Sequence, residues 1–97
     1  MGMKFDTRDD EIAHYHDVYI QLFKKLVKER RRVVGLTQEQ LAEIVGLRQP
    51  AISRLENPNY TKINLETIQR VATGLDCVVS IGLIGRTEIN HEREKSL

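Results

Sequence analysis

The polar side chains of residues 49–57 have the types and the spacing of a surface that recognises a ligand by hydrogen bonding. On a helix that advances about 100° per residue, they gather on one side and leave the apolar side chains on the other. The polar side comprises Gln49, Pro50, Ser53, Arg54 and Asn57. Glutamine can form two parallel hydrogen bonds with an adenine edge, whereas serine discriminates only weakly between bases. The chemistry that fits this helix is the reading of DNA bases, with Gln49 as the main reader. Taken singly, the same residues also fit a solvent-facing helix surface, with Gln49 as a cap and Arg54 as a local partner of Glu56.

Other residue types that often carry chemistry do not combine into a site. His14 and His16 lie two positions apart, so on a helix they point about 200° away from each other and cannot share a metal ion. Cys77 lies among β-branched residues, where a thiol usually acts as an inert small hydrophobe. The sequence also has no glycine-rich phosphate loop and no Cys/His nucleophile pair. We therefore expect no enzymatic activity, no metal site and no cofactor.

A preceding short helix must hold the polar helix at a fixed angle. Thr37 stands three residues before Gln40, which matches the capping box that begins a helix, and Gly46 allows a tight bend at its end. Ala42 permits a close crossing of the two helices. Their shared apolar contacts are expected from Leu41, Val45, Leu47, Ile52 and Leu55. This pattern predicts a helix-turn-helix unit whose second helix, over residues 49–56, protrudes from the domain.

The start of this second helix leaves two roles open for one residue. Arg48 has no side-chain acceptor with which to cap the helix, and Pro50 disfavours helical geometry at Gln49. Gln49 is therefore itself a candidate cap. In that role its side chain would bond its own helix end in place of a base.

Two further helices are expected around this unit. Apolar positions between Asp9 and Val34 recur every three or four residues, which predicts one long helix or two nearly collinear ones. Asp9 or Asp10 can cap its start, and Gly35 can end it. A single helix of this length would measure roughly 39 Å, so we expect its N-terminal part to meet another chain. A fourth helix should begin at the cap Asn64 and bury an apolar stripe.

Residues 77–89 begin with the β-branched sequence CVVSIGLIG, which predicts a buried β-strand or a short buried helix. Because no other strand is predicted, we expect a strand here to pair with its symmetry mate in a dimer. The expected dimer interface comprises Cys77, Val78, Val79, Ile81, Leu83 and Ile84. Residues 90–97 are rich in charge and are expected to form a flexible tail.

Length and charge limit the classes of protein that fit. The 97 residues allow one small domain, whose core a second chain would help to complete. The net charge is only +1, but residues 24–62 hold nine Lys/Arg against four Asp/Glu, and this local excess can serve phosphate contacts. No apolar run is long enough to span a bilayer, and the N-terminus turns acidic where a signal peptide would be apolar. We therefore expect a cytoplasmic protein with no membrane partner.

The sequence TQEQLAEIVGLRQPAISRLEN, followed by a loop and NLETIQRVATGL, resembles the lambda-repressor-like, or XRE-type, helix-turn-helix domain of phage repressors and bacterial regulators. The resemblance covers residues 18–76 and implies a bundle of short helices that binds operator DNA as a dimer. It implies base contacts from Gln49, Pro50 and Ser53, and backbone contacts from Gln38, Arg48, Arg54, Asn57, Tyr60, Thr61 and Lys62. It also implies an ion pair between Arg31 and Glu56. Arg48 replaces the usual Ser or Thr, and Asn57-Pro58 replaces the usual Asn-Gly, so the helix cap and the loop entry depart from the family pattern.

The fold expected from these observations is mainly α, a lambda-repressor-like bundle with a long N-terminal helix and a C-terminal β-strand paired across a dimer. The expected organisation is an N-terminal helical extension over residues 1–17, the DNA-binding domain over 18–76, the dimerisation strand over 77–89 and the tail over 90–97.

Three functions are compatible with this organisation. We expect a homodimeric transcriptional regulator, a repressor, that binds an inverted repeat in double-stranded DNA. The alternative is the antitoxin of a toxin-antitoxin pair, which would regulate its own promoter and dock a toxin protein on Tyr15, Tyr19 and Phe23, although dimer packing also explains these residues. A subunit that has kept the fold and lost DNA binding is less favoured, because no acidic residue interrupts the polar side of the second helix.

Overall fold

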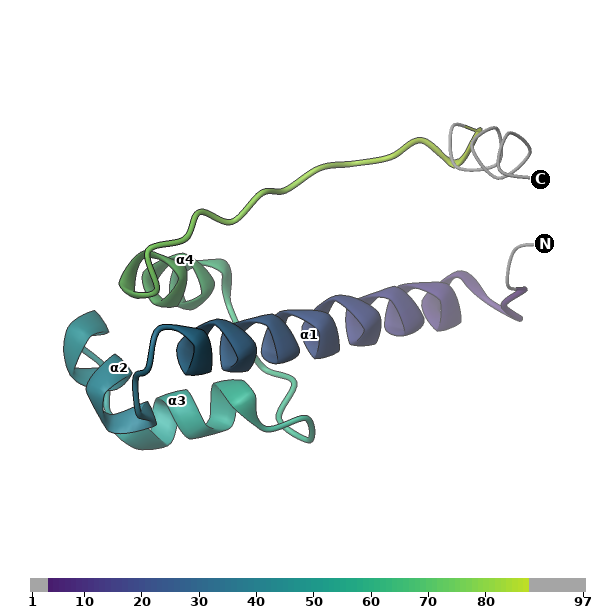
Figure 1. Ribbon diagram of the computed structural model, residues 1–97. Coiled ribbons are helices and arrows are strands. Elements are labelled where there is room, and N and C mark those ends of the chain that lie inside the picture. The colour runs from purple at the N-terminus through teal and green to yellow at the C-terminus, as the bar shows by residue number, and fades with distance from the viewer. Residues whose placement is uncertain (1–3, 88–97) are drawn as a thin grey trace.

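The computed structural model describes residues 4–87, and that part of the chain contains four helices. They are α1 (Arg8–Val33), α2 (Gln38–Val45), α3 (Gln49–Glu56) and α4 (Leu65–Gly74). The three short helices gather around the C-terminal half of α1, and the N-terminal half of α1 extends beyond them (Figure 1). No helix between residues 4 and 87 is long and apolar enough to cross a membrane.

Local hydrogen bonds fix the two ends of α1. At its start, Thr7 Oγ1 accepts a hydrogen bond from the N–H of Asp10 at 3.0 Å, so the prediction that an aspartate caps the helix is wrong. At its end, Gly35 has a φ of 78°, a left-handed conformation that glycine adopts without steric cost. The N–H of Leu36 donates to the carbonyl of Arg31 at 3.1 Å, which closes the helix. The predicted helix end at Gly35 is confirmed.

Apolar side chains from all four helices and from the residue after α4 meet in one core. Its buried members are Val27, Leu41, Ala42, Val45, Ile52, Leu55, Val71 and Leu75. Leu41, Ile52 and Val71, one from each short helix, are completely covered. Because such a core is close-packed, it fixes the orientation of α3 relative to α1 and α2.

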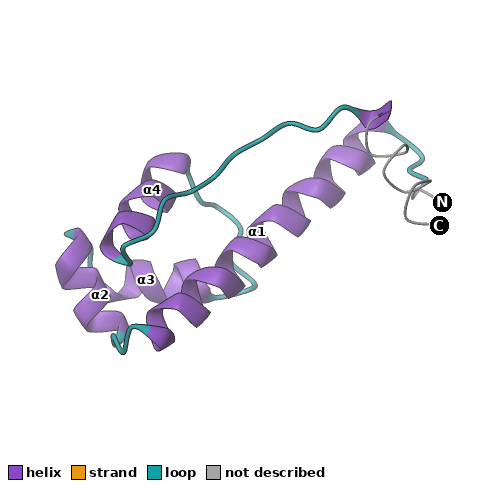
Figure 2. Cartoon of the chain, turned by 45° about the horizontal axis from the view of Figure 1, so that its top comes forward, coloured by secondary structure: helices purple, strands orange, loops and turns teal. Residues whose placement is uncertain are grey.

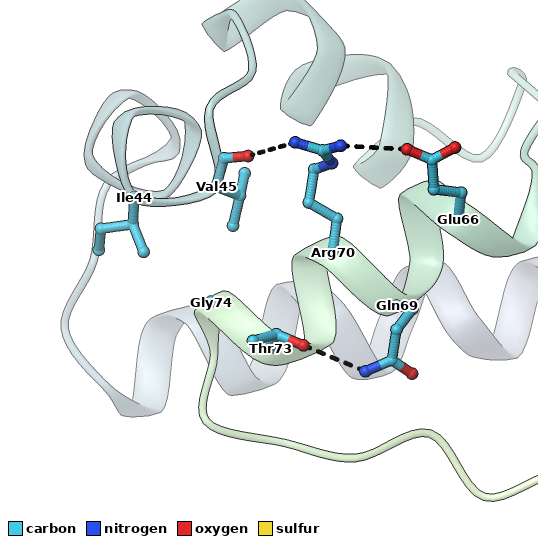
Figure 3. Close-up of a pocket in the computed structure, with 7 residues that line it drawn as sticks. All are labelled: Ile44, Val45, Glu66, Gln69, Arg70, Thr73 and Gly74. Atoms are coloured by element: carbon cyan, nitrogen blue, oxygen red, sulfur yellow. Dashed lines mark hydrogen bonds and ion pairs between the residues drawn. The ribbon is translucent and has the colours of Figure 1, made fainter.

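α4 approaches α2 closely because it ends on a glycine. A Cβ atom at Gly74 would overlap the side chain of Val45. Figure 3 shows this crossing, where Arg70 of α4 donates to the carbonyl of Val45 at 3.4 Å and pairs with Glu66 at 3.0 Å. The small size of Gly74 therefore sets the distance between the two helices.

The segment after α4 corrects the predicted fold class. Residues 77–85 leave α4 and run back toward the N-terminal end of α1 (Figures 1 and 2), but residues 4–87 contain no strand. A β-strand forms only where its backbone groups pair with a second strand, and residues 4–87 offer none. Val78 and Leu83 are accordingly 88% and 101% exposed. The predicted C-terminal strand paired across a dimer is therefore wrong, and so is a short buried helix over residues 77–85.

Two contacts hold this segment at its ends. The N–H of Cys77 donates to the carbonyl of Ala72 at 2.8 Å, which joins the segment to the end of α4. Arg86 pairs with Glu11 at 2.7 Å, which joins it to the beginning of α1. The predicted strand end at residues 88–89 and the predicted tail over 90–97 lie outside the described residues.

Candidate nucleic-acid interface

α2 and α3 form the predicted helix-turn-helix unit. The N–H of Gln40 donates to Thr37 Oγ1 at 3.1 Å, and the N–H of Thr37 donates to Gln40 Oε1 at 2.8 Å, which completes the capping box. Gly46 ends α2 with a φ of 72°, and the N–H of Leu47 donates to the carbonyl of Ala42 at 2.9 Å. Two local motifs of the sequence thus set the turn that leads into α3.

The side chain of Gln49 is held by a hydrogen bond to α2 and does not cap the beginning of α3. Its Nε2 atom donates to Oε1 of Gln38 at 2.8 Å. Arg48 is the cap residue of α3 and makes no side-chain hydrogen bond there. The hypothesis that Gln49 caps α3 is therefore wrong. The bond to Gln38 uses one amide proton of Gln49, and its second amide proton and its carbonyl oxygen are the groups that a bidentate contact with adenine requires.

A chain of hydrogen bonds continues from Gln38 to α1. Nε2 of Gln38 donates to Oε1 of Glu56 at 3.3 Å. Arg31 donates to the same carboxylate through two nitrogens, at 2.6 Å from Nε and 2.9 Å from Nη2. The ion pair implied by the family resemblance is therefore confirmed. We call Arg31, Glu56, Gln38 and Gln49 the polar relay, because they join α1, α2 and both ends of α3.

The polar relay is largely removed from solvent at its ion pair. The side chains of Arg31 and Glu56 are 12% and 3% exposed. Burial alone would raise the pKa of Glu56, but the hydrogen bonds from Arg31 and Gln38 outweigh it and hold that pKa below its ordinary value. The hydrogen bond to Glu56 likewise raises the pKa of Arg31. The pair is therefore ionised, and its two parallel hydrogen bonds fix its geometry.

The residues predicted to contact DNA are exposed on and beside α3. Pro50 and Ser53 lie about one turn apart on the helix, and both are exposed. Nε of Arg54 donates to the carbonyl of Pro50 at 3.3 Å, and its guanidinium lies 5.9 Å from the centre of the Tyr60 ring. The other exposed members of the predicted set are Arg48, Asn57, Thr61 and Lys62. The structure thus brings Pro50, Arg54 and Tyr60 together.

A hollow of about 270 Å³ lies between α3 and the loop that precedes α4. Arg54, Tyr60 and Lys62 contribute to its lining, together with the polar side chains of Asn64 and Thr67. Cations and hydroxyl groups around a concave surface are the groups that contact phosphate oxygens in protein–DNA complexes. Chemically, this hollow suits one phosphate of a DNA backbone.

Lys24 is a positioning residue that the sequence reading missed. It is only 3% exposed, and its Nζ donates to the carbonyls of Arg54 at 3.0 Å and Leu55 at 2.9 Å. These carbonyls belong to the last turn of α3, whose negative dipole end favours a cation. Burial lowers the pKa of Lys24. Its spacing from Ile20 and Val27 places it on the buried face of α1, but lysines on helices are usually exposed, so this signal was weak.

A second long contact fixes the loop after α3. Nε2 of Gln21 donates to the carbonyl of Pro58 at 2.7 Å, and the N–H of Asn59 donates to Oδ1 of Asn57 at 2.9 Å. The departure from the family pattern at Asn57-Pro58 is therefore accommodated by a turn that α1 holds from the side.

The residues predicted at a dimer interface lie in the extended segment, away from α3 (Figures 1 and 2). Val78, Ile81, Leu83 and Ile84 are exposed, whereas Cys77 and Val79 are half-buried. Cys77 also packs against the core. Within residues 4–87, no three His, Cys, Asp or Glu side chains gather as a metal site would require.

Comparisons with known proteins point to the same helical unit. A family profile described as Helix-turn-helix matches residues 27–78, from the last turns of α1 to the beginning of the extended segment. An uncharacterized HTH-type transcriptional regulator of Haemophilus influenzae is 30% identical over 73 residues, which are 75% of this chain and 72% of the relative. A protein of the same description from Methanothermobacter thermautotrophicus is 40% identical over 52 residues, which are 54% of this chain and 74% of the relative.

Proposed function

The chain belongs to the XRE-type helix-turn-helix family of DNA-binding transcriptional regulators, and we propose that it is a repressor that binds an inverted-repeat operator as a homodimer. The observation that carries this proposal is the polar relay. It holds Gln49 at the start of an exposed helix through a hydrogen bond of 2.8 Å from Gln38, while Gln38 is itself tied to a buried ion pair. A base-reading side chain held in advance loses less conformational entropy on binding.

In the proposed complex, α3 enters the major groove and Gln49 reads an adenine through its amide. Pro50 and Ser53 face the same groove because they are exposed beside Gln49 on α3. Pro50 supplies an apolar contact, and Ser53 supplies one hydroxyl. Specificity in this arrangement comes mainly from Gln49.

The surrounding residues contact the DNA backbone. Gln38 reaches a phosphate from the N-terminal end of α2. The remaining phosphate contacts come from Arg48, Arg54, Asn57, Tyr60, Thr61 and Lys62, all of which are exposed. Such contacts orient the protein without reading sequence, and they make binding sensitive to salt.

An inverted repeat requires two copies of α3 related by a two-fold axis. Their half-sites would lie about one turn of DNA apart, roughly 34 Å. We propose that the apolar residues of the extended segment contribute to this dimer by side-chain contact; they are Cys77, Val78, Val79, Ile81, Leu83 and Ile84. The exposure of Val78, Ile81, Leu83 and Ile84 in the single chain supports this assignment.

One observation favours the antitoxin alternative. Tyr15 and Tyr19 are 40% and 64% exposed on the part of α1 that extends beyond the short helices. In that alternative a toxin protein covers these aromatic rings, and α3 binds the promoter of the toxin-antitoxin pair. Co-purification of a protein encoded by the neighbouring gene would support it.

Binding to DNA tests the proposed function directly. We would measure the fluorescence anisotropy of labelled promoter DNA from upstream of this gene and of a scrambled control, over a salt series. We expect preferential binding to the promoter, which weakens as salt rises and falls at least tenfold in Gln49→Ala. Gln69→Ala is a matched control because Gln69 is an exposed glutamine of α4 outside the proposed interface. Equal binding of both DNAs, unchanged by Gln49→Ala, would contradict the assignment.

A further inference from the structure

The outer face of α1 carries an apolar repeat that residues 4–87 leave largely exposed, although Phe5 contacts Tyr15 and Arg86 lies beside the N-terminal end of the repeat. Its members are Ile12, Tyr15, Tyr19, Leu22, Leu26 and Val33, which we call the apolar seam. Each of these side chains is at least 40% exposed, whereas Ile20 and Val27 on the core side of α1 are buried. Successive members lie three or four residues apart, with one gap of seven. Alternation of three and four is the heptad pattern of helices that pair along their length.

We propose that the apolar seam is covered by the seam of a second copy of this chain, with the two α1 helices antiparallel. The proposal rests on the homodimer of the proposed function, and it names the surface and the direction of that dimer. The seam is the main contact of that dimer, and the extended segment assigned above adds to it. The seam does not depend on DNA binding, since it lies outside α2 and α3.

The charges along α1 select the antiparallel direction. The N-terminal half carries Asp9, Asp10, Glu11 and Asp17, and the C-terminal half carries Lys25, Lys28, Arg30 and Arg32. A parallel pair would align the two basic halves with each other, and their repulsion would oppose pairing. An antiparallel pair instead places each acidic half beside the basic half of its partner.

The spacing of the seam allows several symmetric antiparallel registers, and we choose the one in which charged residues at its ends also match. If Tyr19 packs against the partner's Leu22, the same count places Tyr15 against the partner's Leu26. Both layers then join an aromatic ring to a leucine, and symmetry repeats each layer once. The centre of the interface therefore consists entirely of apolar side chains.

Charged residues at the ends of the seam match in the same register. Glu29 fills the gap in the repeat, and it lies opposite the partner's Ile12. In the partner, Arg8 lies one helical turn before Ile12 on the same face. The partner's Arg8 therefore comes within reach of Glu29. Beside the seam, Glu11 lies near the partner's Arg32. Glu29, which interrupts the repeat, thereby comes near an opposite charge, and so does Glu11, which also pairs with Arg86 of its own chain.

The surface area that the seam can bury is that of a small protein–protein interface. Six side chains from each of two copies would bury roughly 1,000 Å² in total, at about 60–120 Å² each, which is the lower limit for a specific interface. A hollow of about 620 Å³ extends along the N-terminal half of the seam, between Tyr15, Tyr19 and Arg86. Side chains of a second helix can enter this hollow without displacing the core. An interface at this lower limit predicts a weak, reversible dimer.

Sedimentation equilibrium of the full chain without DNA tests the surface. We expect the wild type to form dimers and Leu22→Glu to dissociate at least tenfold more readily, because its carboxylate would be buried at the centre of the seam. Leu65→Glu is the matched control, since Leu65 on α4 is 68% exposed and Leu22 is 55% exposed. Circular dichroism would verify that both variants keep the wild-type helix content. A monomeric wild type, or equal dimerisation of all three proteins, would overturn the proposal.

Disulfide trapping tests the direction. Tyr15→Cys and Leu26→Cys would be made separately in a Cys77→Ser background, then mixed and gently oxidised. The antiparallel register brings position 15 of one chain beside position 26 of the other, within the reach of a disulfide. We expect crosslinks between the two variants and few between identical chains. Crosslinks only between identical chains would show a parallel pair and overturn the proposed direction.

Binding to DNA with one or two half-sites separates this proposal from the proposed function. Leu22→Glu should bind a single half-site as the wild type does, because α3 is unchanged, but it should lose the advantage of two half-sites. If the wild type dimerises through the seam and binds no specific DNA, the repressor role fails and the seam stands. If a different protein covers the seam in the cell, the isolated wild type remains monomeric, which overturns the second copy as occupant.

Discussion

The DNA-binding unit and the outer face of α1 leave their side chains in opposite states. Around α3 the ion pair of Arg31 and Glu56 is buried, and within residues 4–87 no buried polar side-chain atom lacks a hydrogen-bond partner. Along the apolar seam, six large side chains remain exposed to solvent. Apolar surface gains free energy only when something covers it. The comparison indicates that the described part of the DNA-binding unit satisfies its own buried polar groups, whereas the outer face of α1 leaves apolar surface that the proposed second copy would cover.

Lys24 and Gln21 mark the boundary between these two regions. Both belong to α1, and both turn toward carbonyl groups of the DNA-binding unit. The core therefore uses one face of α1, and the same helix carries the seam on another. A single helix can thus serve the core with one face and a second molecule with another.

The largest effect should follow from removal of the carboxylate of Glu56. In Glu56→Ala, Arg31 would lose its partner in a buried position, so we expect the free energy of unfolding to fall by about 3–5 kcal/mol. Urea unfolding followed by circular dichroism measures this change. Glu66→Ala is the control, because the pair of Glu66 with Arg70 is exposed and should contribute no more than about 1 kcal/mol. If both variants lost the same unfolding free energy, the buried pair of Glu56 would contribute no more to stability than the exposed pair of Glu66.

A smaller loss is expected when a methyl group is added where α4 crosses α2. In Gly74→Ala, the new Cβ would overlap Val45, and the resulting shift of the two helices should cost about 1–3 kcal/mol of unfolding free energy. Gly82→Ala is the control, since no neighbouring atom lies within 4 Å of its added carbon. The double variant Gly74→Ala/Val45→Ala makes room and should be less destabilised than the sum of the two single variants. If the losses of unfolding free energy in the two single variants simply added up in the double variant, the side chains at positions 45 and 74 would not be in contact.

The smallest expected effect is a loss of stability when the pH is lowered. The pKa of Glu56 lies below its ordinary value in the folded chain, so the relay contributes fully above about pH 4.5, the ordinary glutamate pKa. As the pH falls through the lower folded pKa, the carboxylate takes up a proton and this contribution is lost. We expect the thermal midpoint to fall on acidification more steeply in the wild type than in Glu56→Gln. Parallel pH profiles of the two proteins would contradict a depressed pKa at this position.

Features that depend on a few neighbouring residues could be predicted from the sequence. The capping box of Thr37 and Gln40 and the helix ends at Gly35 and Gly46 each involve residues within five positions of one another. Their geometry follows from side-chain chemistry and from the freedom of glycine at positive φ. The periodic apolar positions then placed four helices correctly. The recognition of the helix-turn-helix family rested on the same local features.

Features that depend on distant residues could not be predicted in this way. The β-branched residues 77–85 favour a strand, but a strand also needs a partner for its backbone, and the part of the chain that the structure describes supplies none. For Gln49 the local chemistry allowed a cap or a reader. A hydrogen bond to Gln38, eleven positions earlier, holds Gln49 away from the cap, and the reading of a base stays a proposal. The burial of Lys24 depends on carbonyls about thirty positions away.

The sequence by itself determined where the helices begin and end, which faces are apolar and which short helix offers hydrogen bonds to a ligand. It could do so because these properties follow from the residue types within one or two turns of chain. Only the tertiary structure decided that Gln49 belongs to a relay that reaches Arg31 on α1, that Lys24 holds the last turn of α3, and that residues 77–85 form no strand. Each of these depends on which groups meet after the chain has folded, because a hydrogen bond or a β-ladder exists only when both of its partners are present.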